Sequence, residues 1–333
     1  MKIIVTGGAG FIGSNLILYL HKNYPETELL NIDKLTYASD LSYLDPLKDS
    51  SRYRFEQIDI VDRAVVREII QEWKPDGVIH LAAESHVDNS IKGPEPFIYS
   101  NVVGTFNLLD ECRLLWFDDT STQETMRFLH ISTDEVYGTL GDTGLFSETT
   151  PYAPNSPYSA SKAGSDFLVR SYFHTYGMNT VITNCSNNYG PHQHDEKLIP
   201  TVIRKALAGE PIPVYGKGDN VRDWLFVEDH CQALATVFYE GTAGEQYNIG
   251  GDNEWQNIEL VNLICEILND EKGQGPDGDY KNLISFVTDR PGHDFRYAVD
   301  ASKIKKELNW APSQDFDSLL HKTVKWFVKK FEG

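Results

Sequence analysis

The chain of 333 residues is longer than a single compact core requires, which predicts one enlarged α/β domain or a large domain with a smaller partner. Apolar residues make up 41% and charged residues 24%, a globular composition that excludes a disordered or collagen-like chain. With 49 acidic and 30 basic residues the formal net charge is −19, so we expect no nucleic-acid partner and no membrane partner. An anionic ligand must then meet a local cluster of cations.

The cysteines and the apolar segments indicate the compartment. Four cysteines lie far apart, with no CxxC pair and no secretory signal ahead of them. We therefore expect reduced thiols in a cytoplasmic protein. Every long apolar stretch is interrupted before the roughly twenty residues that a membrane-spanning helix requires.

Short apolar segments recur along the first half of the chain and predict strands. They lie at residues 2–6, 28–32, 53–57, 77–81 and 128–132. Helix-length segments separate most of them, which is typical of a parallel sheet covered by helices. Residues 180–184 and 245–249 are expected to add later strands to the same sheet.

The domains are expected to be interleaved in the sequence. Residues 1–185, with about 225–252, are assigned to a Rossmann-type, doubly wound α/β domain. Turn signals become dense from about residue 190, so about 186–224 and 253–333 are assigned to a smaller α/β substrate domain. Apolar positions at helical spacing predict a terminal helix over 319–331.

A glycine-rich loop follows the first predicted strand. Gly7, Gly10 and Gly13 lie between that strand and a helix, where a pyrophosphate meets backbone N–H groups at the helix N-terminus. Asp33 follows Gly13 by twenty positions, at the end of the next strand. A carboxylate there binds ribose hydroxyls and repels a 2′-phosphate, which favours NAD over NADP. A glycine turn needed only for packing is the alternative.

Two further strand ends fit the same cofactor. Asp59 and Ile60 follow the third strand, where an adenine could be held. The small residues of Leu81-Ala82-Ala83 end the fourth strand and leave room for a dinucleotide. Each of these signals alone would pass for an ordinary strand end.

Tyr158 and Lys162 lie four residues apart on one face of a helix that Pro154 and Pro157 introduce. An ammonium held beside a phenol favours the phenolate, which can take a hydroxyl proton while hydride leaves the same carbon. The pair is common by itself, and a tyrosine at a core edge with a solvated lysine is the alternative.

The glycine loop, the Tyr158-x-x-x-Lys162 pair and Ser132 upstream together resemble the extended short-chain dehydrogenase/reductase family over essentially the whole chain. Four segments are similar to its nucleotide-sugar 4,6-dehydratase branch. They are residues 81–88 (LAAESHVD), 132–138 (STDEVYG), 186–191 (SNNYGP) and 222–224 (RDW).

The resemblance implies roles for the acidic pair. Glu135 would remove the C5 proton of a sugar and Asp134 would protonate the departing C6 hydroxyl, while Thr133 helps Tyr158 and Lys162 at C4. Such chemistry requires the pair, because a C4 ketone makes the C5 proton acidic and hydroxide cannot leave unprotonated. Neighbouring strand residues point to opposite faces, so both carboxylates reach one sugar only if the backbone has left the sheet there. Two solvated loop carboxylates are the alternative.

The resemblance also implies the ligand contacts. For NAD they are Gly7, Gly10, Phe11, Ile12, Gly13, Asp33, Lys34, Leu35, Thr36, Asp59, Ile60, Leu81, Ala82, Ala83, Ser85, Ser100, Tyr158, Lys162 and Asn188. For the nucleotide sugar they are Ser85, Thr133, Asn187, Lys197, Leu198, Pro213, Val214, Tyr215, Arg222, Asn257, Asp289, Arg290, Pro291, Gly292 and His293.

One segment departs from the family pattern. Residues 192–195 (HQHD) stand where a more aromatic, proline-containing stretch is expected. The departure puts the shape of that loop in doubt. Two histidines without a third ligand at suitable spacing are weak evidence for a metal, and we expect none.

The resemblance implies an NAD-dependent conversion of dTDP-glucose to dTDP-4-keto-6-deoxyglucose and water, with hydride borrowed from C4 and returned to C6. It also implies a homodimer formed through residues 101–115 and 159–176. A dehydratase of a UDP- or GDP-linked sugar stays open, because base selection is not readable from the sequence. A nucleotide-sugar 4-epimerase needs no acid and base after Thr133. A catalytically silent NAD-sensing regulator would keep the fold but does not need an intact tyrosine, lysine and carboxylate pair.

Overall fold

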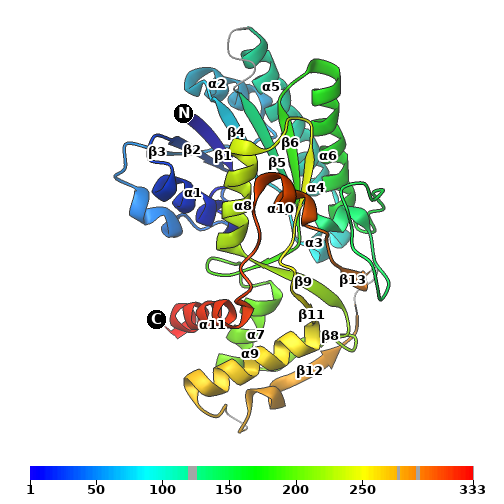
Figure 1. The fold of residues 1–333 in the computed structure, drawn as a ribbon. Coiled ribbons are helices and arrows are strands. Elements are labelled where there is room, and N and C mark those ends of the chain that lie inside the picture. Colours follow the sequence, from blue (N-terminus) through cyan, green and yellow to red (C-terminus); the bar gives the residue numbers. More distant parts are fainter. Residues whose placement is uncertain (119–125, 276–277, 290–292, 333) are drawn as a thin grey trace.

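The computed structural model describes residues 1–118, 126–275, 278–289 and 293–332. Figure 1 shows two parts, with a parallel sheet between layers of helices in the upper part and a smaller group of helices and short strands below. Arg290, Pro291 and Gly292, expected at the nucleotide, lie outside the described residues.

A seven-stranded parallel sheet forms the larger part, in the order β10-β6-β5-β4-β1-β2-β3. Its strands are β1 (Lys2–Thr6), β2 (Glu28–Asp33), β3 (Tyr53–Gln57), β4 (Gly77–His80), β5 (Arg127–Thr133), β6 (Thr180–Cys185) and β10 (Gln246–Ile249). The order reverses beside β1, and open α/β sheets bind ligands at such a switch point. Each predicted strand is present, and the α/β, Rossmann-type fold class is confirmed.

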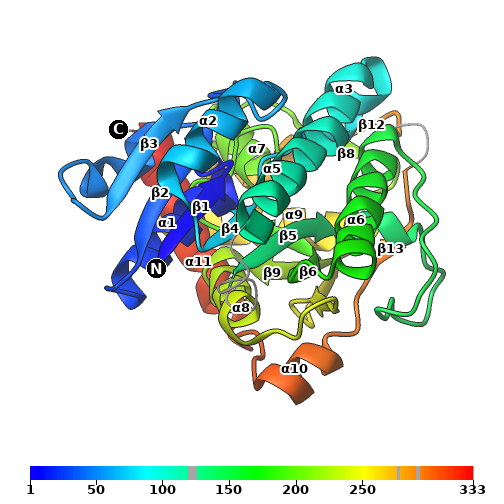
Figure 2. The same cartoon turned by 90° about the horizontal axis from the view of Figure 1, so that it is seen from above.

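Helices cover both faces of the sheet. One face carries α1 (Phe11–Asn23) and α8 (Val227–Glu240), and the other carries α2 (Arg63–Trp73), α5 (Thr105–Asp118) and α6 (Pro157–Tyr176). Figure 2 shows the two layers from above. The central strands are buried on both sides because each layer supplies an apolar face, with Ile17 and Leu234 on one side and Val66 and Leu109 on the other.

The smaller part has its own apolar core. Short strands β7 (Asn187–Tyr189), β9 (Val221–Phe226), β11 (Glu254–Gln256) and β13 (Arg296–Tyr297) pair with one another, and β8 (Ile212–Tyr215) pairs with β12 (Ile284–Val287). Helices α7 (Leu198–Leu207), α9 (Asn257–Lys272) and α11 (Phe316–Glu332) pack around residues such as Val202, Ile264 and Phe327. The predicted terminal helix is therefore present.

Several short helices connect these elements. They are α3 (Val87–Lys92), α4 (Glu95–Phe97), α10 (Ser302–Leu308), η1 (Leu41–Leu47), η2 (Ile98–Gly104), η3 (Asp134–Tyr137) and η4 (Tyr280–Leu283). Helix α10 returns to the larger part, where Ile304 joins the core of α1 and α8. We propose that the two ligand-binding domains follow the two cores. The chain passes between the cores several times, and one of these crossings lies near Leu225, whose side chain packs with the first core while Trp224 packs with the second.

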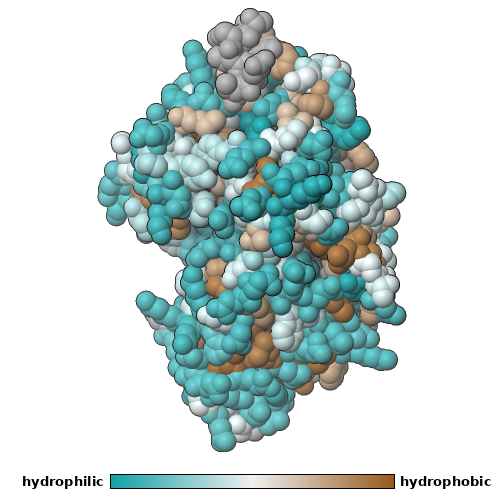
Figure 3. Space-filling view, viewed as in Figure 1, coloured by the Kyte–Doolittle hydropathy of each residue, from teal (hydrophilic) through white to brown (hydrophobic). Residues whose placement is uncertain are grey.

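The visible surface is largely polar. Figure 3 shows a mostly hydrophilic face on which apolar residues form separate patches, and its outline narrows between the two parts. Within the described ranges, every helix is too short or too polar to span a lipid bilayer. The four cysteines are buried, and none of them is in a disulfide.

Candidate active site

A cavity of about 320 Å³ opens at the carboxyl ends of the central strands, where the two parts meet. It brings together the glycine loop, Asp33, the acidic pair and the Tyr158–Lys162 pair. Of the residues expected to contact NAD, the cavity wall includes Gly7, Gly10, Phe11, Ile12, Gly13, Asp33, Lys34, Thr36, Asp59, Ile60, Leu81, Ala82, Ala83, Ser85, Ser100, Tyr158, Lys162 and Asn188. Leu35 lies just behind the wall and donates its N–H to Asp33 Oδ1 at 2.8 Å.

The glycine loop requires glycine for two reasons. Gly7 has a φ of +70°, and a Cβ there would lie 2.7 Å from the backbone nitrogen of Ala82. A Cβ on Gly13 would lie 2.2 Å from the carbonyl oxygen of Gly7. Helix α1 begins at Phe11, and its N-cap residue Gly10 supplies no side-chain cap. The first N–H groups of α1 are thus available to an anion in the cavity.

Asp33 is held in place at the end of β2. Its Oδ2 accepts from the Ala9 N–H at 3.0 Å, and its Oδ1 accepts from the Leu35 N–H and from the Ser39 hydroxyl at 3.0 Å. These bonds orient the carboxylate in the cavity wall beside the glycine loop, the position that a ribose-binding acid occupies in dinucleotide folds.

The acidic pair leaves the sheet as the sequence predicts. Strand β5 ends at Thr133, and the 3-10 helix η3 begins at Asp134. The Thr133 hydroxyl caps η3 by accepting from the Glu135 N–H at 3.3 Å. The turn places Thr133, Asp134 and Glu135 in the wall of one cavity, which a continuing strand could not do.

Asp134 is the more deeply buried carboxyl of the pair, with 2% of its surface exposed. Its Oδ1 accepts from the Thr133 hydroxyl at 3.3 Å, and its Oδ2 has no hydrogen-bond partner among the described residues. Burial, followed by the charges of Glu135 and Asp223, raises the pKa of Asp134 well above its ordinary value. Asp134 is therefore set up to hold a proton.

Helix α6 presents Tyr158 and Lys162 to the same cavity. Ser156 and Ser159 form a capping box at the start of this helix, and Pro157 fits its first turn. The Lys162 ammonium donates to the carbonyl of Ile131 at 2.8 Å. Burial, followed by Glu135, raises the pKa of Tyr158 well above its ordinary value, so the ammonium does not by itself produce the phenolate that the sequence favours.

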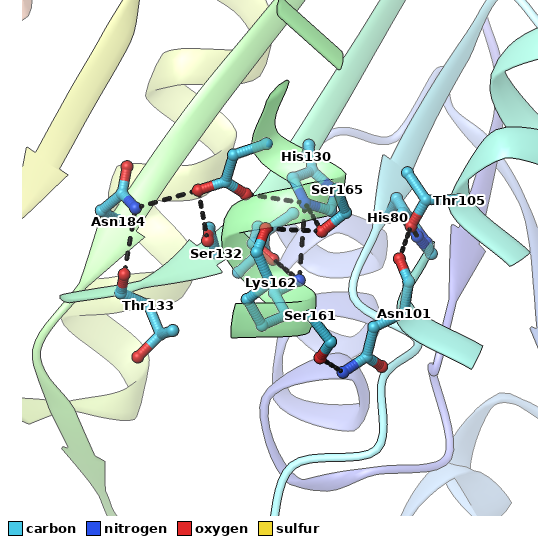
Figure 4. Close-up of polar contacts among 12 residues, drawn as sticks. His80, Asn101, Thr105, His130, Ser132, Thr133, Ser161, Lys162, Ser165 and Asn184 are labelled. Carbon is cyan, nitrogen blue, oxygen red and sulfur yellow. Dashed lines mark hydrogen bonds and ion pairs between the residues drawn. The ribbon is translucent and has the colours of Figure 1, made fainter. Parts of the chain in front are cut away.

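A buried polar cluster lies behind Lys162, between β5, β6 and α6. His130 Nε2 is 3.5 Å from Lys162 Nζ, 3.2 Å from Ser165 Oγ and 3.2 Å from Asp166 Oδ1. Figure 4 shows Lys162, His130 and Ser165 pointing towards one another. Asp166 Oδ2 also accepts from Ser132 at 2.8 Å.

Sequence reasoning missed His130 and Asp166. The available signals were a histidine inside an otherwise apolar strand, and an acid that follows Lys162 by one helical turn. A second series of hydrogen bonds lies beside these residues, in which His80 is bonded to Thr6 at 2.7 Å and to Thr105 at 2.9 Å. It ties the strand before the glycine loop to β4 and its following helices.

The residues expected at the nucleotide sugar separate into two groups. Ser85, Thr133, Asn187 and Lys197 line the cavity. Among the described residues, its wall does not include Leu198, Pro213, Val214, Tyr215, Arg222, Asn257, Asp289 and His293. These belong to the smaller part, where His293 Nδ1 lies 2.6 Å from Asp289 Oδ1, within hydrogen-bond distance, and the His293 ring approaches Tyr215 edge-on.

The Arg222 guanidinium has a structural environment of its own. It donates to the carbonyl oxygens of Val221, Asp294 and Phe295 at 2.7 to 3.2 Å, and it lies 4.3 Å from the ring centre of Tyr297. It is buried, so it holds residues 294–295 against β9.

The segment that departs from the family pattern forms part of the cavity rim. The His192 ring stacks on Tyr43 with centres 4.0 Å apart, and its Nδ1 is 2.9 Å from the Ser14 hydroxyl of α1. Further along, the Tyr37 hydroxyl donates to Glu196 at 3.3 Å. The loop thus bridges the smaller part and the dinucleotide-binding side of the sheet.

The doubly wound sheet, the glycine loop and the Tyr158–Lys162 pair define a dinucleotide-dependent enzyme of the extended short-chain dehydrogenase/reductase class. The family model described as GDP-mannose 4,6 dehydratase matches residues 4–323. A dTDP-glucose 4,6-dehydratase of Neisseria meningitidis serogroup B is 56% identical over 331 residues, which are 98% of this chain and 93% of that protein.

Solved structures agree with the sequence relatives. A dTDP-glucose 4,6-dehydratase from Bacillus anthracis, in complex with NAD, is 42% identical with a TM-score of 0.88, covering 100% of this chain and 98% of that one. The corresponding enzyme from Streptomyces venezuelae, with NAD bound, is 43% identical with a TM-score of 0.89, covering 99% and 97%. The chain belongs to the nucleotide-sugar 4,6-dehydratase family, in its dTDP-glucose branch.

Proposed function

We infer that this protein is an NAD-dependent dTDP-glucose 4,6-dehydratase, a hydro-lyase that converts dTDP-glucose to dTDP-4-keto-6-deoxyglucose and water. The observation that carries this inference is the meeting of Asp134 and Glu135 with Tyr158 and Lys162 in one cavity beside the glycine loop. The full-length similarity to dTDP-glucose 4,6-dehydratases supports the same conclusion.

The residues of the cavity fit NAD. The glycine loop has no side chains to block a diphosphate at the start of α1. Asp33 offers a carboxylate to the adenosine ribose. Asp59 and Ile60 line the adenine side, while Lys162 and Tyr158 line the opposite end. When bound, NAD stores the hydride of C4 and returns it to C6.

We propose that Tyr158 takes the C4 hydroxyl proton. Tyr158 and Thr133 both line the cavity, and the Thr133 hydroxyl lowers the pKa of Tyr158 against the larger effect of burial. Lys162 supplies the positive charge that favours the phenolate once the cavity is filled. Asn187 and Ser85, from opposite sides of the cavity, would hold the sugar.

Asp134 and Glu135 divide the elimination between them. Burial raises the pKa of Asp134, which favours the protonated form that can donate to the departing C6 hydroxyl. Glu135 is less buried and acts as the base at C5, and it later returns that proton to C5. A 4-epimerase does not need this pair, so the geometry favours the dehydratase.

The substrate's nucleotide is proposed to lie towards the smaller part. Lys197 is the cation of the cavity wall on that side, and its Nζ donates to the Ser85 carbonyl at 3.3 Å. The cluster of Tyr215, Asp289 and His293 lies beyond the cavity and is our candidate for nucleotide contacts.

We also propose a cytoplasmic homodimer. Exposed apolar side chains lie on the helices expected at the interface, with Leu114 on α5 and Phe167 and Tyr176 on α6. Their exposed fractions of 42%, 59% and 45% are high for apolar groups on adjacent helices, which is typical of a covered surface. Light scattering on the purified protein tests the mass, and a monomer at all concentrations contradicts it.

Incubation of the purified protein with dTDP-, UDP- and GDP-sugars, without added NADH, tests the function. We expect an alkali-induced keto-sugar chromophore with dTDP-glucose. Deuterium placed at C4 should appear in the product methyl group. Methyl hydrogen that comes from solvent, or a product without a ketone, contradicts the proposed reaction. A stronger signal with the UDP- or GDP-sugar supports the alternative dehydratase.

A further inference from the structure

The proposed reaction leaves two side chains in the wrong protonation state. Tyr158 gains the C4 hydroxyl proton and does not return it, because C4 remains a ketone in the product. Asp134 loses its proton to the departing water. Glu135 ends as it began, since the proton that it takes from C5 returns to C5. One proton must therefore pass from Tyr158 to Asp134 before the next turnover.

The Thr133 hydroxyl interacts with both of these groups. It donates to Asp134 Oδ1 at 3.3 Å, and it lies close enough to the Tyr158 side chain to lower the pKa of Tyr158 against the larger effect of burial. Its remaining contact is with the Glu135 N–H, which donates to it at 3.3 Å. A hydroxyl can accept one proton and release another, so Thr133 has the partners that a relay requires.

The backbone holds this hydroxyl in position. The Thr133 carbonyl accepts from Asn184 Nδ2 at 3.0 Å, and Figure 4 shows this bond joining the end of β5 to β6. Thr133, Asp134 and Tyr158 have exposed fractions of 8%, 2% and 9%. Exchange with bulk water is restricted at all three, which favours an internal route.

We propose that the Thr133 hydroxyl carries the proton from Tyr158 to Asp134 and thereby resets the enzyme after each turnover. This inference rests on the proposed function of the site. The Tyr158 O–H bond breaks as an O–H bond forms on Thr133 Oγ1, and the original Thr133 proton moves to Asp134 Oδ1. Only protons move and no group is oxidised or reduced. Tyr158 becomes a phenolate, and Asp134 becomes a neutral acid.

The surrounding charges favour this direction. Burial and the neighbouring Glu135 carboxylate favour the protonated form of both Asp134 and Tyr158, so the direction of transfer depends on the positive charges beside Tyr158. The Lys162 ammonium, one helical turn from Tyr158, favours the phenolate, and oxidised NAD bound in the cavity would add a second positive charge. The same arrangement therefore prepares the base at C4 and the acid at C6.

Rapid-quench kinetics on Thr133→Val and Thr133→Ser test the relay with dTDP-glucose and the NAD-loaded enzyme. For Thr133→Val we expect a burst of about one product per active site, followed by a steady state about 100-fold slower. Small general acids such as formate or imidazole should speed the steady state and leave the burst unchanged. Thr133→Ser keeps the hydroxyl and should recover most of the steady-state rate that Thr133→Val loses.

Two results overturn the relay. One is a wild-type steady state in Thr133→Val, and the other is equal slowing of the first and later turnovers with no burst and no rescue. NAD content and thermal unfolding establish that the variant is folded, and Thr133→Ala replaces it if the valine is not accommodated. Failure of the wild type to form keto-sugar overturns the proposed function itself, which separates the two conclusions.

Discussion

Lys162 and Asp166 lie one helical turn apart on α6 and approach the same ring nitrogen of His130, Nζ at 3.5 Å and Oδ1 at 3.2 Å. All three side chains are buried. Burial lowers the pKa of Lys162 to about 8, and the Asp166 charge opposes that effect. Burial likewise raises the pKa of Asp166 to about 6, and Lys162 opposes it. Near neutral pH each charge therefore keeps the other ionised.

Replacing Asp166 with asparagine should shift the pH dependence of turnover. Without the carboxylate, the pKa of Lys162 falls below about 8, so the ammonium is lost at a lower pH. We expect the basic limb of the kcat profile to move down by about one pH unit, which corresponds to about 1.4 kcal/mol. A kcat profile measured between pH 6 and about 10 with saturating substrate reports this limb directly.

Asp270→Asn is the matched control for this shift, because it removes the same charge from an exposed position on α9. Its profile should superimpose on that of the wild type. If Asp166→Asn lowers kcat equally at every pH, Asp166 serves the packing of the cluster and does not set the charge of Lys162.

Two glycines of the loop should respond differently to a methyl group. In Gly13→Ala the new Cβ would lie 2.2 Å from the Gly7 carbonyl, so both folding and NAD binding should fail, with a stability loss of about 3 kcal/mol. In Gly10→Ala the nearest atom is the Gly7 oxygen at 3.3 Å, so the fold should survive. The added methyl would still crowd the diphosphate. Thermal unfolding with and without NAD separates these outcomes, and equal behaviour of the two variants contradicts the geometry.

The choice between NAD and NADP should depend on Asp33. In Asp33→Asn the charge that repels a 2′-phosphate is removed, so the preference for NAD should fall by about tenfold or more. Titration of cofactor-stripped protein with NAD and with NADP, monitored by tryptophan fluorescence, measures the ratio of the two dissociation constants. Asp59→Asn removes a charge from the same cavity near the adenine side and should leave the ratio close to that of the wild type. An unchanged ratio in Asp33→Asn contradicts the assignment.

Much of the fold and part of the site follow from local sequence signals. Residues 2–6 and 128–132 are apolar runs of strand length, and alternation with helices leaves few arrangements for a parallel sheet. Gly7, Gly10 and Gly13 predict a close backbone approach, and a Cβ added at Gly7 or Gly13 would lie less than 3 Å from neighbouring backbone atoms. The departure of Asp134 from the sheet was predictable because two adjacent carboxylates cannot otherwise share a ligand.

Contacts between residues far apart in the sequence could not be predicted from local sequence signals. His130 and Asp166 are far apart in sequence and gain meaning only when β5 packs against α6. From the sequence Arg222 is expected at the nucleotide sugar, whereas in the structure three backbone carbonyls accept hydrogen bonds from its guanidinium. The balance of charges at Tyr158 also depends on burial, which spacing along a helix does not reveal.

His192, in the segment at the cavity rim, should make the folded protein less stable in mild acid. Burial lowers the pKa of His192 to about 4 from an ordinary value of 6.5, so the unfolded chain binds a proton more readily than the folded one. The contribution is absent above pH 6.5 and grows as the pH falls towards 4, reaching about 2 kcal/mol at pH 5. His192→Phe keeps a ring to stack on Tyr43 and cannot be protonated, so its free energy of unfolding should fall by about 2 kcal/mol less than that of the wild type between pH 7 and pH 5. His174→Gln, at an exposed position on α6, should follow the wild type in urea unfolding at both pH values. An equal loss in His192→Phe and the wild type would show that His192 does not cause the acid sensitivity.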